Sequence, residues 1–191
     1  MITEKETIRC EAVFDDTKSY RYMWKRVWDK TKPSVVVVML HPCFSDNILA
    51  DTTTNLVVNN VMRLGIYGGV CITNLYAKMT DKMLFRWDSQ ERLIGSDNDE
   101  FIRKAALEVE DVILAWGVGA DKIKSVASRI ASVVSLLKEM NKNLYSISDG
   151  KRVGLHPLTP SVRSKWILQA FSERDAVVGA TLDIEAGSQE E

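Results

Sequence analysis

The sequence lacks the features that mark several large classes of protein. It has no apolar run long enough to cross a lipid bilayer, so no membrane span is expected. It also lacks a basic excess, because the net charge is −1, whereas proteins that wrap duplex DNA usually carry many surplus cations. These absences favour a small-molecule ligand, or a very local contact with single-stranded nucleic acid.

Cysteines are also few, and their positions exclude two kinds of site. Cys10, Cys43 and Cys71 form no close pair and show no metal-ligand spacing. Their odd number and wide separation are typical of reduced thiols in the cytoplasm, which is the expected location. The N-terminus has no apolar core behind a basic start, so no secretory signal is expected. The chain has no glycine-rich phosphate loop and no serine nucleophile elbow, and we expect no metal and no cofactor.

Histidine is the rarest of the residue types whose side chains can carry a charge. The chain has 2 histidines, and each directly precedes a proline. His41 ends the apolar run Val35–Leu40, and His156 lies in a late loop with the same His-Pro pattern. A run this short and β-branched predicts a strand buried on both faces, and Pro42 must end it because proline cannot donate to a sheet ladder. Loops after such strands are where open α/β sheets bind ligands.

Alternating and periodic apolar segments predict an α/β fold. Because strands alternate with helices, we expect a single domain over residues 1–184, built as a three-layer sandwich with a mainly parallel sheet, followed by a flexible acidic tail over 185–191. Residues 7–14 and 19–29 are expected to form an antiparallel hairpin. The other expected strands cover residues 35–40, 70–75, 111–116 and 144–147, and the expected helices cover 52–64, 96–108 and 120–140.

Several chemically useful side chains are expected to meet at the carboxyl edge of this sheet. A neutral histidine donates a hydrogen bond to a developing anion, and a carboxylate orients a water molecule. An asparagine amide offers a donor and an acceptor together, which suits the edge of a nucleobase. Such a group suits cleavage of a base from a sugar. Its members are His41, Asp46, Asp51, Asn74, Trp116 and His156.

Structural roles remain open for each of these residues. The histidines can stabilise turns, the aspartates can cap helices or turns, and Asn74 can close a strand. The cationic and aromatic segment with Arg21 and Tyr22 is either a solvated strand face or a lip that binds a nucleotide.

The order of the motifs resembles a bacterial and phage family known only as domain of unknown function 1643. The resemblance covers most of the chain, from Tyr20-Arg21-Tyr22 to His156-Pro157-Leu158. In this sequence His41 stands where the family has asparagine, and Thr53 stands where it has proline. The segments between those ends that resemble the family pattern are Met39-Leu40-His41-Pro42-Cys43, Ala50-Asp51-Thr52-Thr53, Ile66-Tyr67-Gly68-Gly69, Asn74-Leu75-Tyr76-Ala77, Asn98-Asp99 and Ala115-Trp116-Gly117.

More distantly, the same order resembles the uracil-DNA glycosylase superfamily. That resemblance implies that Asp46 or Asp51 positions a water molecule, that Asn74 recognises the base, and that His156 stabilises the leaving group. His41, Trp116, Tyr22 and Arg21 are then expected to bind the substrate.

These observations lead to three hypotheses from different classes. The first is an enzyme that acts on a nucleoside, nucleotide or nucleobase, with hydrolysis at the N-glycosidic bond. The second is a phage or bacterial protein that sequesters a nucleotide without turnover. The third is an interaction protein in which the long helix from Ala120 forms a homodimer face.

Overall fold

The computed structural model describes residues 1–43, 48–80 and 89–172, so the predicted tail at 185–191 lies outside the described residues. One seven-stranded sheet has the order β1-β2-β4-β3-β5-β6-β7. Its strands are β1 (Arg9–Phe14), β2 (Arg21–Val27), β3 (Ser34–Met39), β4 (Gly69–Asn74), β5 (Asp111–Leu114), β6 (Asn143–Ser148) and β7 (Ile167–Ala170). The helices are α1 (Thr52–Leu64), α2 (Gln90–Ile94), α3 (Asn98–Leu107) and α4 (Lys124–Glu139), with 3₁₀ turns at η1 (Ala120–Lys122) and η2 (Pro160–Val162).

The sheet is mixed, with a parallel centre and antiparallel edges. Strands β4, β3, β5 and β6 are parallel neighbours, and helical crossovers lead from β3 to β4, from β4 to β5 and from β5 to β6. The predicted hairpin of β1 and β2 is confirmed, and it joins β4 in antiparallel fashion, while β7 pairs antiparallel with β6. The expected hairpin provides one antiparallel edge, but the expectation of a mainly parallel sheet did not include the antiparallel pairing of β7 at the other edge.

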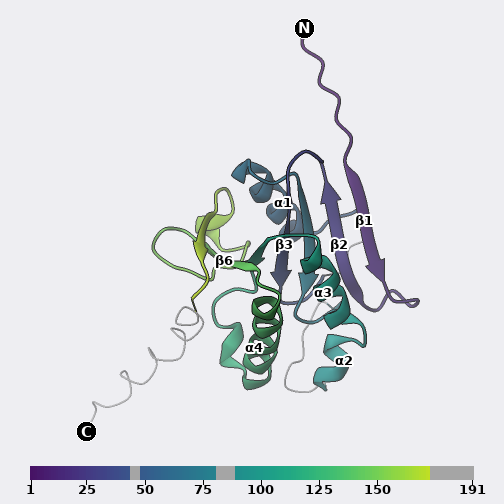
Figure 1. Ribbon diagram of the computed structural model, residues 1–191, viewed down its shortest axis with the longest axis vertical. Helices are drawn as coiled ribbons and strands as arrows, with labels where there is room; N and C mark the ends of the chain where they lie inside the picture. The colour runs from purple at the N-terminus through teal and green to yellow at the C-terminus, as the bar shows by residue number, and fades with distance from the viewer. Residues whose placement is uncertain (44–47, 81–88, 173–191) are drawn as a thin grey trace.

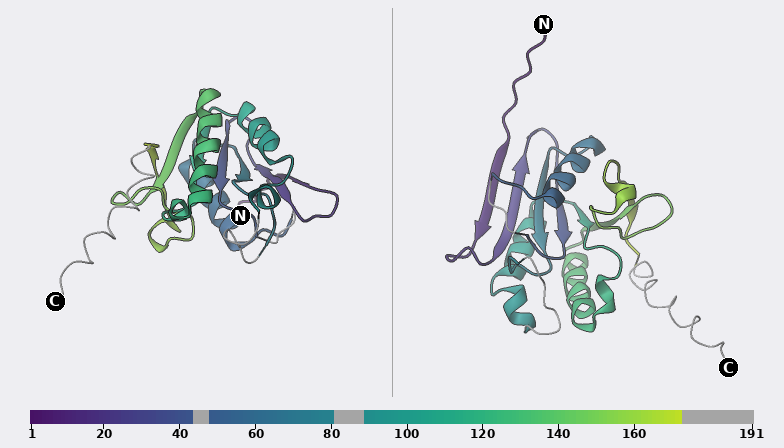
Figure 2. Two further views of the ribbon diagram at one scale, coloured as in Figure 1. Left: turned by 90° about the horizontal axis from the view of Figure 1, so that it is seen from below. Right: turned by 180° about the vertical axis from the view of Figure 1, so that it is seen from behind.

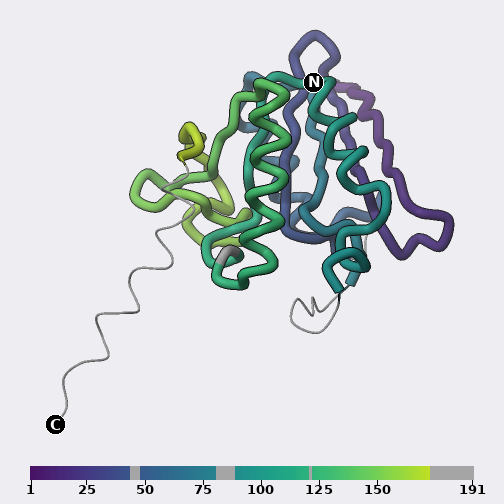
Figure 3. The backbone as a smooth tube through the Cα atoms, turned by 60° about the horizontal axis from the view of Figure 1, so that its bottom comes forward, coloured from purple at the N-terminus to yellow at the C-terminus, as the bar shows by residue number. Residues whose placement is uncertain are grey.

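Helices cover both faces of the sheet, and β3 explains why. Its alternate residues Val36 and Val38 pack with α3 and α4, whereas Val35 and Val37 pack with α1. Figures 1 and 3 show α3 and α4 side by side over one face, and the view from behind in Figure 2 shows α1 on the other. A strand buried on both faces must be apolar at every position, which accounts for the unbroken run of valines.

Helix α1 ends at the glycine that the sequence predicts, and its cap is Asp51, which precedes the segment Thr52–Asn55 that was expected to cap it. The Asp51 side chain caps its start by accepting a hydrogen bond from the Thr54 amide, and Gly65 ends it in the left-handed conformation. Helix α4 buries its apolar stripe in the core of this chain, at Val126, Ile130, Val133, Val134 and Leu137. That stripe is therefore occupied, and the predicted homodimer stays a prediction. In the described part of the chain, no helix is long and apolar enough to span a bilayer.

A register shift in the hairpin decides which way two site candidates face. Val13 pairs with Met23 while Phe14 pairs with Arg21, so Tyr22 is an extra residue on β2. Tyr22 consequently stacks on Phe101 of α3, with ring centroids 5.1 Å apart, instead of sharing the face of Trp24. The expected period of two along this strand is thus broken, and Arg21 is turned toward the side of α1.

The turn before β4 requires a glycine for a steric reason. The Gly68 carbonyl accepts hydrogen bonds from the amides of Trp28 and Asp29, both at 2.9 Å. A Cβ atom at Gly68 would lie 1.8 Å from the Asp29 carbonyl oxygen. The backbones on either side of this turn therefore approach too closely for any side chain at position 68.

We predict that Gly68→Ala destabilises the protein more than Gly65→Ala. Gly65 has φ of +74° but open space around its Cβ position, so alanine there costs about 1 kcal/mol of left-handed strain. Alanine at Gly68 additionally forces two backbone segments apart. Urea unfolding of both variants measures the difference, and equal free energies of unfolding would contradict the steric explanation.

Candidate functional site

A cavity of about 180 Å³ opens at the carboxyl edge of the sheet, where β3 and β4 end side by side. The chain leaves β3 toward α1 on one face and leaves β4 toward α3 on the other. Neighbouring strands whose connections diverge in this way leave a crevice between them, the usual ligand site of open α/β sheets. Five residues expected from the sequence line this cavity: Arg21, His41, Asp51, Asn74 and His156.

Asn74 is the most unusual member of this group. Its side chain is 1% exposed, and neither its amide nitrogen nor its amide oxygen has a hydrogen-bond partner among the described residues. A buried amide without partners costs free energy, because both groups lose their hydrogen bonds to water. A donor and an acceptor held ready at the wall of a cavity indicate a ligand that supplies the complementary pair.

A buried polar clamp holds the backbone at Asn74. The Asn98 amide nitrogen donates to the carbonyl oxygens of Asn74 and Leu75, at 3.0 and 3.1 Å. Arg129 Nε donates to the Leu75 carbonyl at 2.8 Å, and its guanidinium pairs with Asp99. Residues of α3 and α4 thus fix the carboxyl end of β4 and leave the Asn74 side chain to the cavity.

The second His-Pro loop presents a neutral imidazole. The Leu158 amide donates to His156 Nδ1 at 3.1 Å, and the Thr159 amide donates to the His156 carbonyl at 2.8 Å, which closes a turn around Pro157. A ring nitrogen that accepts a hydrogen bond carries no proton, so the His156 proton lies on Nε2. Burial, and then the nearby charge of His41, lower the pKa of His156.

The tight seat of His156 depends on the glycine of the Ala-Trp-Gly segment. Gly117 has φ of +92°, and a Cβ atom there would lie 2.9 Å from the Cβ atom of His156. The loop after β5 therefore packs directly against the histidine loop. This contact gives a structural reason for a glycine immediately after Trp116.

His41 follows β3 and shows the opposite local pattern. Its Nδ1 lies 3.4 Å from the Pro42 carbonyl oxygen, a long contact in which the ring nitrogen must be the donor. Burial lowers the pKa of His41, partly offset by this backbone contact. At neutral pH the ring is uncharged, with Nε2 left as an acceptor.

Arg21 and Asp51 bring opposite charges to the cavity. Arg21 is 2% exposed, and burial lowers its pKa, while the charge of Asp51 acts in the other direction. The two carboxylate oxygens of Asp51 accept from the amide and the hydroxyl of Thr54, each at 2.9 Å. Asp51 is thus first of all the cap of α1, which is the structural role left open for it in the sequence.

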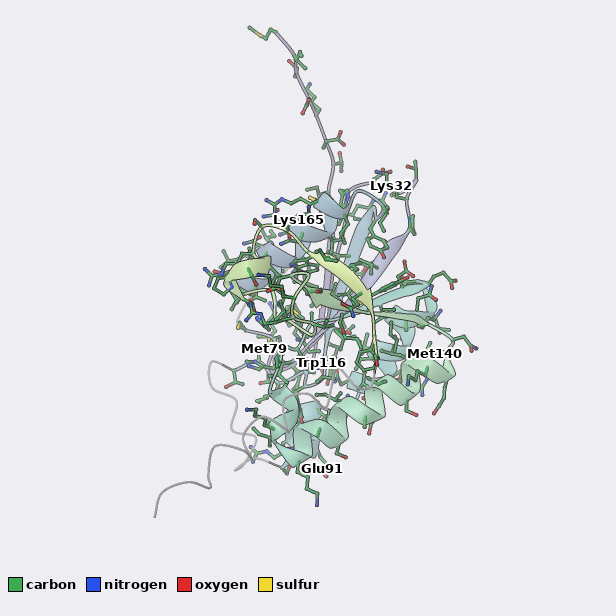
Figure 4. All side chains as sticks on the ribbon, turned by 90° about the vertical axis from the view of Figure 1, so that its left-hand side faces the viewer. Lys32, Met79, Glu91, Trp116, Met140 and Lys165 are labelled. Atoms are coloured by element: carbon green, nitrogen blue, oxygen red, sulfur yellow. The ribbon has the colours of Figure 1, made fainter. Side chains whose placement is uncertain are left out.

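Two of the expected site residues that the structure describes, Tyr22 and Trp116, do not line the cavity. Tyr22 stacks on Phe101, and half-buried Trp116 packs against the α3 and α4 side of the core. In the view of Figure 4, Trp116 lies between Lys32, which precedes β3, and Glu91 of α2. Asp46 lies outside the described residues.

Sequence reasoning missed the clamp of Asn98 and Arg129. Asn98 belongs to the Asn98-Asp99 pair that resembles the family pattern, and Arg129 lies on the helix expected from its apolar period. The sequence does contain a signal for this contact. Arg129 lies on the apolar face of its helix, among Val126, Ile130 and Val133, and an arginine buried on such a face rarely lacks a partner.

We predict that Arg129→Leu lowers the free energy of unfolding by about 1.5 to 3 kcal/mol, the range for hydrogen bonds to charged groups. The loss includes the bond to the Leu75 carbonyl and the pairing with Asp99. Arg103→Leu is the matched control, since Arg103 is exposed on α3 and its replacement should change stability by less than about 0.5 kcal/mol. Equal effects in urea unfolding would show that the clamp does not stabilise the end of β4.

Comparison with known proteins gives one match. No curated protein and no solved structure matches the chain. The family described as protein of unknown function DUF1643 matches residues 21–158, a span that runs from Arg21 on β2 to Leu158 beside His156 and so includes the ends of both strands that flank the cavity. The chain therefore belongs to the DUF1643 family.

Proposed function

We propose that this protein is an enzyme that binds a nucleobase of a nucleoside or nucleotide and hydrolyses its N-glycosidic bond. The observation that carries the proposal is the Asn74 amide, buried and without a partner among the described residues at the wall of the cavity. A nucleobase edge offers adjacent donors and acceptors, which an amide side chain matches in two hydrogen bonds.

The size of the cavity supports a ligand with one ring. Its volume is about 180 Å³. A cavity of roughly 150 Å³ holds one benzene molecule, whereas pockets for drug-sized ligands measure roughly 300 to 1,000 Å³. We therefore expect a single-ring base to enter, with the sugar and any phosphate or single-stranded chain outside.

The neighbours of Asn74 supply the remaining roles in the proposal. His156 Nε2–H donates to the base as it leaves with the bonding electrons. Arg21 is a buried cation that favours an anionic group on the ligand. We also propose that the fold is the expected three-layer, glycosylase-like arrangement. Helices on both faces of the sheet support this proposal.

One observation favours the alternative of nucleotide sequestration without turnover. Both carboxylate oxygens of Asp51 are engaged in capping α1, so this carboxylate is less available to orient a water. Recognition through Asn74 would be the same in both cases. The two functions differ in whether the ligand is recovered intact.

We predict that Asn74→Leu abolishes base release while leaving the free protein at least as stable as the wild type. The substitution removes a buried amide that costs free energy when no ligand is present. Chromatography of nucleosides, nucleoside monophosphates and short single-stranded DNA after incubation would detect the free base, and urea unfolding would report stability.

Thr73→Val is the matched control. Thr73 is the preceding residue of β4, fully buried, and its hydroxyl also has no partner among the described residues. Valine should leave base release unchanged. Base release by Asn74→Leu at the wild-type rate would overturn the assignment of Asn74. A ligand that binds the wild type but is always recovered intact would select the sequestering alternative.

A further inference from the structure

The two histidines differ in how their rings are held. The Nδ1 atom of His156 accepts from the Leu158 amide, so the ring proton lies on Nε2. The Nδ1 atom of His41 lies 3.4 Å from the Pro42 carbonyl oxygen, which can only accept, so a hydrogen bond between them requires the ring proton on Nδ1. Neither Nε2 atom makes a hydrogen bond to the described residues, so Nε2 is a donor in His156 and an acceptor in His41.

The two rings also act on each other. Both line the same cavity, and a charge on His41 disfavours a charge on His156. Two imidazolium rings in this partly buried site would repel each other and would lose hydration. At neutral pH both rings are thus uncharged, and the pair offers one acceptor and one donor without a net charge.

We propose that His41 and His156 form an uncharged acceptor–donor pair, in which His41 Nε2 is the general base of the reaction and His156 Nε2–H is the donor to the leaving base. The choice of reaction rests on the proposed function. His41 takes this role because, among the described cavity residues, the carboxylate of Asp51 is already committed to capping α1.

The step balances without any further reactant. The bond between the sugar carbon and the base nitrogen breaks, and its electron pair leaves with the base. The oxygen of a water molecule forms a new bond to that carbon, and a water proton passes to His41 Nε2. His156 Nε2–H hydrogen-bonds the departing base. The proton on His41 then passes to the base, directly or through water, and both rings are neutral again.

Other charged or titratable groups line the same cavity as the two histidines. Arg21 approaches from β2, Asp51 from the start of α1 and Cys43 from the loop after β3. The charges of Arg21 and Asp51 act in opposite directions on an imidazolium. Titration of the pair is therefore followed in the complete chain, where these groups are all present.

Nuclear magnetic resonance of the imidazole nitrogens tests the pair without any ligand. The chain contains only 2 histidines, so His41→Asn and His156→Asn assign the two sets of signals. At pH 7.5 we expect the proton of His41 on Nδ1 and that of His156 on Nε2, and we expect His41→Asn to raise the pKa of His156. The same tautomer in both rings, or a charged ring at pH 7.5, would overturn the pair.

Base release by the variants tests the role of His41. We expect His41→Asn to lower kcat by a factor of about 10² to 10⁴, the usual contribution of a general base, with KM changed only a few fold. The rise of wild-type kcat with pH, through a pKa below that of an ordinary histidine, should also disappear. Full kcat in His41→Asn would overturn the assignment. A wild-type protein that releases no base would instead overturn the proposed function, whatever the tautomers are.

Discussion

The parallel pairing of β3 with β4 is the constraint on which the site depends. Its register sets Met39 opposite Asn74, so both strands end at the same level. The helices that follow these strands pack on opposite faces of the sheet, which leaves the crevice open at that level. His41 lies two residues beyond the end of β3, and Asn74 is the last residue of β4. The register of the two strands therefore places His41 and Asn74 at the same cavity.

The polar groups around this crevice divide into those that hold its backbone and those that face the cavity. Asp51, Asn98 and Arg129 use their side chains on the backbone, at the start of α1 and at the end of β4. Among the described residues, the Asn74 side chain and the Nε2 atoms of the two histidines have no such partner. Side chains that are fixed to the backbone by such hydrogen bonds, next to polar atoms that the described residues leave without partners, are the arrangement expected of a preorganised binding site.

Local sequence patterns predicted the strands and helices well. They failed where packing in three dimensions decides which side of the sheet a side chain faces. The valine run and the Asp51 to Gly65 limits of α1 were readable because burial and capping act over a few residues. The extra residue at Tyr22 was not, since a bulge leaves no mark in apolar alternation, and it turned Arg21 and Tyr22 to different sides. The apolar neighbours of Arg129 on α4 indicated its burial, but its partner did not show in the sequence, because the Leu75 carbonyl is a backbone group that any residue supplies.

The central claim is that a nucleobase occupies the cavity beside Asn74. Thermal unfolding of the wild-type protein with free single-ring bases, then with nucleosides and nucleotides, tests it most directly. A base present at a hundred times its dissociation constant adds about 2.7 kcal/mol, which for a chain of this size raises Tm by roughly 5 to 10 °C. We expect such a shift with at least one single-ring base or its nucleoside. A Tm unchanged by every base, nucleoside and nucleotide would contradict the claim.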